Sequence, residues 1–379
     1  MKHELGILNT MWNERKRNPV LPRFMTYIVT FSCNARCIMC DSWKKDSPDD
    51  LTLEEIGGIF DQLPRMDAVR LSGGEPFVRR DMLDIAHMTQ DKLKPYFLHI
   101  TTNGFLTKRI VEFCENRRKD VPLFLLISVD GVEDKHNEVR GHKKAWDYVM
   151  KTIDALAPRR KELRLEMAIN QTVVDAEGAR QYQQLRDHLK PYNVRNNMVM
   201  AYDASATYSL ESEIVSPSGI GELLTFGDFT KDDIRNLIED VESNLSDQPM
   251  HERIAQRYYL DGLRARLLDE AKTPKPNPPC VALSTHMRLF PNGDVPVCQF
   301  NTRTVGNFRK QSFEEIWWGD AIKPERDWVH GCPGCWAECE VLPNAMYTGD
   351  ILKAIKPPRR KRRRDEKKEP NRTLLPVLD

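Results

Sequence analysis

The sequence predicts an α/β fold with a barrel-like parallel sheet, followed by a small α+β unit rich in cysteine. Apolar or alternating runs recur between residues 24 and 202, and helical stretches separate them at intervals of about 30 to 40 residues. Five of the nine cysteines lie beyond residue 279. Six strands, each with a returning helix, place a functional site at the carboxyl ends of the strands. The expected strands are Tyr27–Ser32, Ala68–Ser72, Phe97–Thr102, Phe124–Val129, Arg164–Ile169 and Asn197–Tyr202.

The side chains of these strands alternate between a polar and an apolar face. His99, Thr101 and Asn103 share one face of the third strand, and Glu166 and Asn170 share one face of the fifth. If the apolar faces pack under helices, the polar faces line an open barrel that holds a polar ligand. A register error of one residue would reverse every face, so this alternative stays open.

Changes in composition divide the chain into five parts. A core barrel (24–228) follows an N-terminal segment (1–23). A helical connector (229–279) ends in the run TPKPNPP, which is typical of a stiff linker. The cysteine-rich domain (280–345) and a basic tail (346–379) complete the chain.

The formal net charge of +1 conceals an uneven distribution. Eleven Lys and Arg against four acidic residues give the segment 351–379 a charge of +7, which leaves −6 for the body. No aromatic residue interleaves the basic run PPRRKRRRDEKK, so we do not expect nucleic-acid binding and interpret the tail as a solvated segment or a docking site for an acidic partner.

The chain shows no membrane or export signal. No stretch approaches the roughly 20 consecutive apolar residues of a membrane span. Residues 1–20 also lack the apolar core of a signal peptide. We therefore expect a cytoplasmic protein without a membrane span. An odd number of cysteines in such a chain argues for metal ligation over a disulfide framework.

Three cysteines stand in the run CNARCIMC directly after the first expected strand. Cys33, Cys37 and Cys40 have the spacing C-x3-C-x2-C, and three thiolates on one short loop can hold three irons of a [4Fe–4S] cluster. The fourth iron then stays open for a bidentate ligand. Zinc is the main alternative, but a structural zinc site needs four ligands and no nearby His completes this set.

At this point the sequence resembles the radical S-adenosylmethionine (SAM) superfamily, whose signature has the same cysteine spacing after the first strand of a partial (βα)6 TIM-like barrel. The second expected strand ends in Gly73-Gly74-Glu75-Pro76. In the superfamily this GGEP element holds the methionyl amino group. Glycines let the backbone approach closely, and a carboxylate and exposed carbonyls accept hydrogen bonds from an ammonium.

Two further elements carry the resemblance. TTNG closes the third strand, and SVDG closes the fourth and is followed by an arginine. The resemblance implies that Ser128 contacts the ribose of SAM and that Arg140 binds its carboxylate. Asn103 joins the SAM site by the same resemblance, although an Asn before Gly is also a common turn residue. Met39 stands where the family often has an aromatic residue, and its thioether can pack against adenine.

The second cysteine group follows a turn signal. Pro291-Asn292-Gly293-Asp294 between apolar runs predicts a β-hairpin, flanked by Cys280 and Cys298. With C-x2-C-x3-C downstream, the region resembles the SPASM/Twitch extension of radical SAM enzymes, which carries auxiliary [4Fe–4S] clusters. Five cysteines cannot ligate two cubic clusters, so we favour one auxiliary cluster. Its expected ligands are Cys280, Cys298, Cys332 and Cys335, with Cys339 either spare or substituting for Cys335; a zinc ribbon is the alternative.

The resemblance implies reductive cleavage of SAM to a 5′-deoxyadenosyl radical that abstracts hydrogen from a peptide or a small polar metabolite. A reductant such as flavodoxin or ferredoxin is the implied partner, and the auxiliary cluster serves substrate oxidation or electron relay. Candidate catalytic residues are Glu166, as a base, and Cys339, as a hydrogen donor. Each has a structural alternative, a salt bridge for the glutamate and cluster ligation for the cysteine. His286 and Cys114 are expected to be structural.

The substrate has alternatives from different classes. Sulfatase maturases place an Asp after the cysteine that matches Cys298, and this chain has Gln299, which argues against that branch. A sugar or aminocyclitol dehydrogenase or epimerase is one alternative to a peptide maturase. A non-catalytic iron–sulfur or zinc scaffold, which docks a partner through the basic tail, is the alternative of another class.

Overall fold

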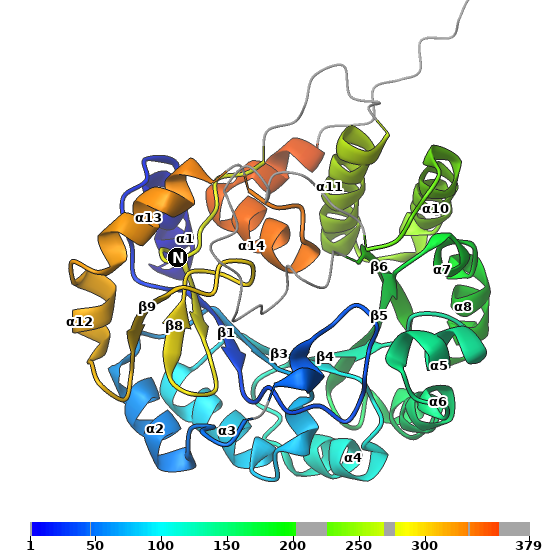
Figure 1. Cartoon of the computed structure of the whole chain (residues 1–379), viewed down its shortest axis with the longest axis horizontal. Coiled ribbons are helices and arrows are strands. Elements are labelled where there is room, and N and C mark those ends of the chain that lie inside the picture. The colour runs from blue at the N-terminus through cyan, green and yellow to red at the C-terminus, as the bar shows by residue number, and fades with distance from the viewer. Residues whose placement is uncertain (1, 46, 202–225, 269–276, 333, 356–379) are drawn as a thin grey trace, which may run out of the picture.

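The structure, a computed structural model, describes residues 2–45, 47–201, 226–268, 277–332 and 334–355. The basic tail from residue 356 and most of the linker lie outside the described residues. Strands and helices alternate through the first half of the chain, as the sequence predicts (Figure 1). The elements of this half are α1 (Lys2–Arg15), β1 (Phe24–Ile28), α2 (Leu53–Gln62), β2 (Ala68–Ser72), α3 (Met82–Met88), η3 (Thr89–Leu93), β3 (Phe97–Thr102), α4 (Thr107–Asn116), β4 (Leu123–Ser128), α5 (Asp134–Arg140), α6 (Ala145–Leu156), β5 (Leu165–Val173), α7 (Ala176–Arg180), α8 (Tyr182–Leu189) and β6 (Arg195–Met200).

The six predicted strands are confirmed. Ala68–Ser72 and Phe97–Thr102 have the predicted bounds, and the ends of the other four differ by up to four residues. They form a parallel sheet in the order β6-β5-β4-β3-β2-β1, and the helices cover its outer surface (Figure 1). The sheet curves into an incomplete barrel, so the carboxyl ends of its strands surround one central region.

The predicted division of the strand faces is also confirmed. The main hydrophobic core joins the outward residues of the strands, such as Leu98, Ile100 and Met167, to helix residues such as Phe60 and Phe113. The polar residues of the same strands are absent from this core and face the inside of the barrel. The lumen therefore carries polar side chains, unlike the Val-, Ile- and Leu-filled interior of a closed barrel.

A seventh strand from the cysteine-rich region completes the sheet. β7 (His286–Leu289) pairs in parallel with β1, with Thr26 opposite Arg288. The predicted hairpin around Gly293 is therefore wrong in part, because the strands before and after this turn belong to different sheets. β8 (Asp294–Pro296) pairs antiparallel with β9 (Thr304–Asn307). The turn itself forms: Phe290 N donates to Asp294 O at 2.8 Å.

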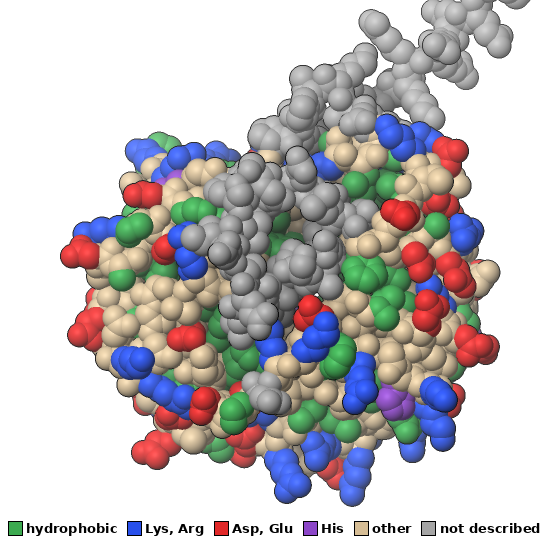
Figure 2. All heavy atoms as spheres, in the orientation of Figure 1, with side chains coloured by type: hydrophobic (Ala, Val, Ile, Leu, Met, Phe, Trp, Pro, Cys, Tyr) green, Lys and Arg blue, Asp and Glu red, His purple; other side chains and the backbone are tan. Residues whose placement is uncertain are grey.

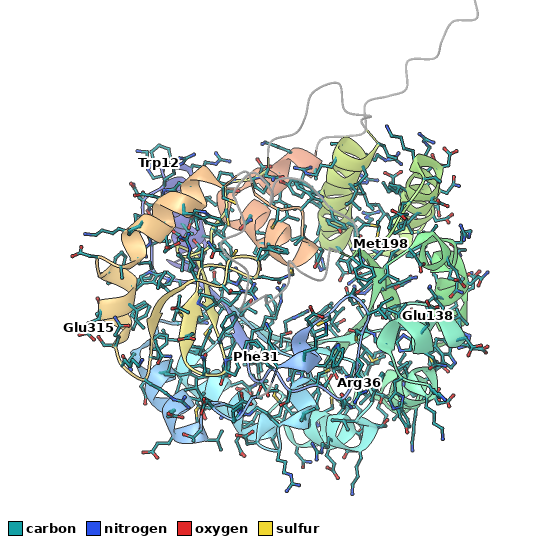
Figure 3. All side chains as sticks on the ribbon, in the orientation of Figure 1. Trp12, Phe31, Arg36, Glu138, Met198 and Glu315 are labelled. Carbon is teal, nitrogen blue, oxygen red and sulfur yellow. The ribbon has the colours of Figure 1, made fainter. Side chains whose placement is uncertain are left out.

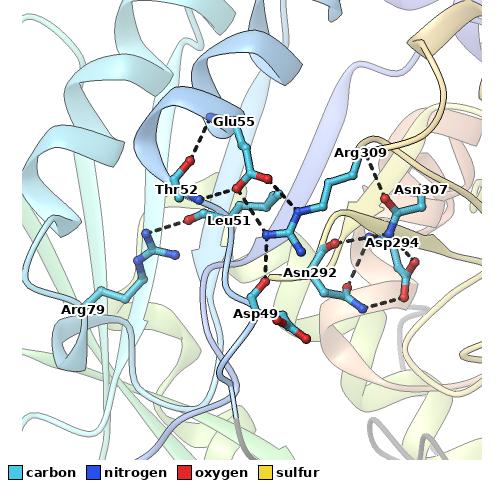
Figure 4. A network of polar contacts seen from close by, with 9 residues as sticks. All are labelled: Asp49, Leu51, Thr52, Glu55, Arg79, Asn292, Asp294, Asn307 and Arg309. Carbon is cyan, nitrogen blue, oxygen red and sulfur yellow. Dashed lines mark hydrogen bonds and ion pairs between the residues drawn. The ribbon is translucent and has the colours of Figure 1, made fainter.

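A polar network holds the β8–β9 sheet against the start of α2 (Figure 4). Arg309 donates to the Glu55 carboxylate at 2.7 Å and to the Asp49 carbonyl at 3.1 Å. Glu55 also closes the capping box of α2 with Thr52. The hydrogen bonds that Glu55 accepts from Arg309 and Thr52 lower the pKa of its carboxyl to about 2. Leu51 N donates to Pro291 O at 2.6 Å, so the cysteine-rich region also contacts the residues before α2 through the backbone.

Helices α11 and α14 lie between the two ends of the sheet, β7 and β6, and α12 and α13 contact β9 (Figure 1). Trp336 precedes α14 and donates its indole N–H to the Tyr259 carbonyl in α11 at 2.9 Å. A Cβ on Gly262 would lie 1.7 Å from the Trp336 ring, so only glycine allows this packing. No helix among the described residues has the length and apolar character of a membrane span. The helices in the second half of the chain include α10 (Lys231–Ser243), α11 (Met250–Leu267), α12 (Phe313–Trp318), α13 (Ile322–Gly331), α14 (Glu338–Thr348) and η8 (Asp350–Ile355).

A buried charge network joins β7, α14 and β1. Arg288 and Glu340, each 3% exposed, form an ion pair, and Glu340 lies 3.4 Å from His286 Nδ1. His286 Nε2 shares a hydrogen bond of 2.9 Å with Thr26 Oγ1. Arg288 and His286 hold the pKa of Glu340 at about 2 against the opposing effect of burial. The network confirms the structural role expected for His286.

Replacement of Arg288 by Met should destabilise the protein by about 3–5 kcal/mol, because it leaves the buried Glu340 carboxylate without its main counterion. Urea denaturation of anaerobically purified protein, with the iron content measured in parallel, gives the change in the free energy of unfolding. The matched control is Lys323→Ala, which breaks an exposed ion pair with Asp320 and should cost less than about 0.5 kcal/mol. A similar small loss for both variants would contradict the role of the buried pair.

Candidate functional site

The loop that carries Cys33, Cys37 and Cys40 crosses the carboxyl end of the barrel. Phe31 and Arg36 of this segment lie toward the centre of the molecule, whereas Glu315 lies at its outer edge (Figure 3). The loop backbone is fixed to the end of α5: Arg36 N donates to Arg140 O, and Ile38 N to Val139 O, both at 3.0 Å. Cys37 is 8% exposed, and the other two thiols are half-buried. The three cysteines therefore sit on a braced loop.

Two glycines bring the end of β2 against the start of this loop. Gly74 N donates to Thr30 O at 2.9 Å. A Cβ on Gly73 would lie 2.3 Å from the Thr30 oxygen, and one on Gly74 would lie 2.3 Å from the Phe31 oxygen and 2.4 Å from that of Ser32. Side chains are excluded at both positions by backbone atoms, which cannot move aside. The glycine pair therefore sets the position of the loop.

Glu75 ties the end of β2 to the end of β3. Its carboxylate, 1% exposed, accepts hydrogen bonds from Asn103 N at 2.7 Å, Thr102 Oγ1 at 2.8 Å and Phe77 N at 3.1 Å. Burial raises the pKa of this carboxyl to about 7. The structure thus places Glu75 and Pro76 behind the wall of the site, where the carboxylate holds two strand ends together.

A pocket of about 620 Å³ opens beside the cysteines. The pocket is open to solvent on one side. The structure brings to it most of the residues predicted for the first cluster and for SAM. The pocket is lined by Cys33, Ala35, Cys37, Met39, Cys40, Ser42, Trp43, Ser72, Gly73, Gly74, Thr101, Thr102, Asn103, Ser128 and Arg140.

Arg140 has a partner that the sequence reasoning missed. Its guanidinium pairs with the fully buried Asp130, with Nε to Oδ2 at 2.6 Å and Nη2 to Oδ1 at 2.9 Å. The remaining nitrogen, Nη1, donates to Cys37 Sγ at 3.4 Å. The Asp in the run SVDG was the available signal, since a buried arginine needs a carboxylate. Asp130 fixes Arg140 with one edge toward the pocket.

The first cysteine group suits a [4Fe–4S] cluster better than a single ion. Within the described residues no three His, Cys, Asp or Glu side chains lie close enough to hold one metal ion. Thiolates around a cubic cluster stand farther apart than those around zinc, and N–H donors to sulfur tune such clusters. Arg140 Nη1 and Ala35 N, which is 3.4 Å from Cys33 Sγ, are such donors. Burial raises the pKa of Cys33 to about 12, so cluster binding must displace thiol protons.

A second cavity, of about 360 Å³, lies among the downstream cysteines. Its wall includes Cys280, Cys298, Cys332 and Cys335, the four residues predicted to hold the auxiliary cluster. Trp328 also lines it, and the indole N–H is buried without a hydrogen-bond partner in the described part of the chain. Four thiols around one enclosed space, with a spare N–H donor, fit a ligated cluster. A single zinc ion finds no such group of ligands among the described residues.

The fifth downstream cysteine lies apart from this cavity. Cys339 is absent from the lining and directs its thiol to Gln299 Oε1 at 3.4 Å. Burial raises the pKa of the Cys339 thiol to about 12.

Glu166 stands at the amino end of β5, away from the pocket, with its side chain 71% exposed and 3.7 Å from Arg195. The structure therefore does not bring Glu166 to the other site residues. Cys114 is fully buried in the core, as expected.

Comparison with known families matches both parts of the chain. A model described as the radical SAM superfamily matches residues 27–185, and one for an iron–sulfur cluster-binding domain, SPASM, matches residues 280–339. Fe-coproporphyrin III synthase of Methanosarcina barkeri is 28% identical over 147 residues, 38% of this chain and 36% of that protein. GTP 3′,8-cyclase of Haemophilus influenzae is 30% identical over 138 residues, 35% of this chain and 40% of that protein. The chain thus spans well under half the length of these relatives.

Two solved structures share the fold over most of the chain. Streptococcus suis SuiB bound to S-adenosylmethionine has a TM-score of 0.57 and 18% identity, and covers 83% of this chain and 69% of SuiB. anSMEcpe with bound AdoMet has a TM-score of 0.55 and 17% identity, and covers 88% of this chain and 96% of anSMEcpe. At these identities the likeness concerns the fold.

The substitution Gly74→Ala should remove the first cluster, because the new Cβ cannot coexist with the backbone oxygens of Phe31 and Ser32. Of about eight irons in a chain with two cubic clusters, about four should be lost, with the auxiliary site still loaded. Iron and sulfide analysis after anaerobic purification measures this. Gly58→Ala in α2 is the control, since its Cβ meets nothing within 4 Å. It should keep all iron and stabilise the helix by about 0.5–1 kcal/mol. Full iron in Gly74→Ala would refute the role of this contact.

Proposed function

We propose that the chain is a radical SAM enzyme, as its match to that superfamily over residues 27–185 supports, and that it cleaves SAM reductively and abstracts a hydrogen atom from a peptide or a small polar metabolite. One observation carries the proposal: the cysteine triplet, the glycine pair, Ser128 and Arg140 line a single pocket at the carboxyl ends of the strands. A [4Fe–4S] cluster with SAM, when bound, supplies the one-electron cleavage that yields the 5′-deoxyadenosyl radical.

The residues of the chain bind and orient the cofactors. Cys33, Cys37 and Cys40 would hold three irons. The backbone carbonyls beside Gly73 and Gly74 would accept hydrogen bonds from the methionyl ammonium, since the Glu75 carboxylate already has three donors of its own. Ser128 would bind the ribose. Arg140 is paired with Asp130 and would reach the SAM carboxylate only through its Nη1 edge, so this contact would be weaker than one from an unpaired arginine.

The downstream cysteines would hold the auxiliary cluster. Cys280, Cys298, Cys332 and Cys335 supply a complete set of four ligands around the second cavity. A fully ligated cluster suits electron transfer, either as the acceptor of an electron from an oxidised substrate or as a relay. Trp328 would donate a hydrogen bond to a sulfur of this cluster, which raises its reduction potential. A flavodoxin or a ferredoxin is the expected reductant for the first cluster.

The substrate class rests on the shape of the fold and on the lumen. SuiB, which shares the fold, has been solved with its precursor peptide SuiA. We therefore place peptide modification first. The short polar lumen also suits a small polar metabolite, such as a sugar or an aminocyclitol.

One observation favours epimerisation as a second candidate function. Cys339 lies outside the auxiliary cavity with its thiol bonded to Gln299, and burial favours the protonated form, so the thiol could serve as a hydrogen donor. A thiol can return a hydrogen atom to a carbon-centred substrate radical and becomes a thiyl radical. An electron and a proton must then restore the thiol, and a reduced auxiliary cluster would be the electron source. A dehydrogenase has no need for this thiol.

Cysteine variants separate these roles. Cys33→Ala should abolish dithionite-dependent release of 5′-deoxyadenosine, and Cys335→Ala should remove only the iron of the auxiliary cluster, about four of eight. Cys339→Ala should keep all of its iron, since its side chain lies outside the cavity. Iron analysis and chromatography of the SAM products measure the three outcomes. Loss of auxiliary iron in Cys339→Ala would make this residue a ligand. Release of 5′-deoxyadenosine by Cys33→Ala would contradict the role of Cys33 as a ligand of the first cluster. A colourless wild type that binds zinc and leaves SAM intact would favour the scaffold alternative.

A further inference from the structure

Two polar side chains stand next to each other on the lumen face of the barrel. Arg70 in β2 and His99 in β3 are register partners, so they project side by side into the lumen. Phe124 of β4 stacks on the His99 ring with centroids 5.4 Å apart, and the Arg70 guanidinium lies 5.3 Å from the centre of the Phe24 ring. Aromatic rings thus hold both side chains in place.

Within the described part of the chain no carboxylate pairs with the Arg70 guanidinium at ion-pair distance, although its charge opposes the rise in pKa that burial causes at the nearby Glu338 and Glu340. Arg70 donates through Nη1 to the Cys339 carbonyl at 3.1 Å. Its Nε is buried without a partner, as is Nδ1 of His99. Burial and the charge of Arg70 lower the pKa of His99 well below its usual value, so the imidazole is neutral. A half-buried cation beside an imidazole with an unpartnered nitrogen is costly unless a ligand completes the site.

The pair lies between the two cavities. Ser72 and Thr101, which line the pocket beside the first cysteine group, follow Arg70 and His99 by two residues on the same strand faces. Two residues along a strand span about 7 Å. On the other side, Arg70 contacts the first turn of α14, whose Cys339 thiol bonds to Gln299, the neighbour of Cys298 in the auxiliary cavity. A ligand on Arg70 would therefore face both cavities.

We propose that Arg70 and His99 bind a carboxylate group of the substrate. The guanidinium fork matches a carboxylate, and a neutral imidazole can donate a second hydrogen bond to it. A dianionic phosphate fits less well, because Glu338 and Glu340 lie at the same end of α14 and would repel a second negative charge. The inference rests on the proposed function, since it makes this ligand the substrate. A carboxylate site of this kind favours a substrate with an acidic side chain or a chain-terminal carboxylate, or a free amino acid, over a neutral sugar.

The test measures binding of 4-acetamidobutanoate and of its uncharged amide to the anaerobic holoenzyme, by saturation-transfer NMR. The carboxylate should bind at least tenfold more tightly than the amide. Arg70→Gln should weaken carboxylate binding by at least tenfold, whereas Arg70→Lys, which keeps the charge and loses the fork, should weaken it less. His99→Phe keeps the stack on Phe124 and should weaken binding several-fold. Arg65→Gln is the matched control: this arginine precedes the same strand, bonds to the Lys94 carbonyl on the surface and should not alter binding.

The outcomes separate this inference from the proposed function. Equal binding of the carboxylate and the amide, no binding of either, or wild-type binding by Arg70→Gln would overturn the carboxylate site. Far-UV circular dichroism and iron content establish whether each variant is folded, and Arg70→Lys and His99→Phe carry the test if Arg70→Gln is not. A wild type that binds the carboxylate without iron or SAM cleavage would overturn the proposed function and leave the site intact.

Discussion

The structure depends on one contact between backbones. The end of β2 reaches the start of the cysteine loop at Gly73 and Gly74, where carbonyl oxygens occupy the space that side chains would need. This contact holds the loop against the end of β2. The backbone hydrogen bonds from Arg36 and Ile38 hold it against the end of α5. The Glu75 carboxylate then links β2 to β3. The position of the three thiols thus follows from hydrogen-bonded backbone, which has few alternative arrangements.

Polar side chains inside the barrel need hydrogen-bond partners in place of water, and the cysteine-rich region supplies some of them. Thr26, Arg70 and His99 place polar atoms inside the barrel, where each needs a partner. β7 brings His286 and Arg288 beside Thr26, and α14 brings Glu340 as their common acceptor. The region therefore does more than carry cysteines. It completes the sheet and brings charged partners into the lumen, whereas Arg70 keeps a buried Nε without a hydrogen-bond partner in the described part of the chain.

The sequence predicted the local elements of this structure better than the pairing of segments that lie far apart in the chain. The six strands and their faces follow from alternation within five or six residues, and the cysteine loop follows from its spacing. The pairing of β7 with β1 joins residues about 260 positions apart through a four-residue strand, and no local pattern signals it. The Asp130–Arg140 pair was missed for a related reason, because the two residues lie ten positions apart and only the fold brings them together. The candidate Glu166 was misplaced because β5 runs on to Val173, four residues beyond the predicted end, which leaves Glu166 at the amino end of the strand.

The position of Cys339 follows from where α14 begins. The helix starts at Glu338, one residue beyond Ala337, so Cys339 lies in its first turn while Cys335 lies on the preceding loop. A loop can place a thiol on the cavity wall, but helical geometry rotates the next cysteine away, toward Gln299. Glu340, one residue further along the helix, turns back to the cavity and to Arg288. The same helix start therefore keeps Cys339 off the wall of the second cavity and presents its carbonyl to Arg70, which links α14 to the lumen.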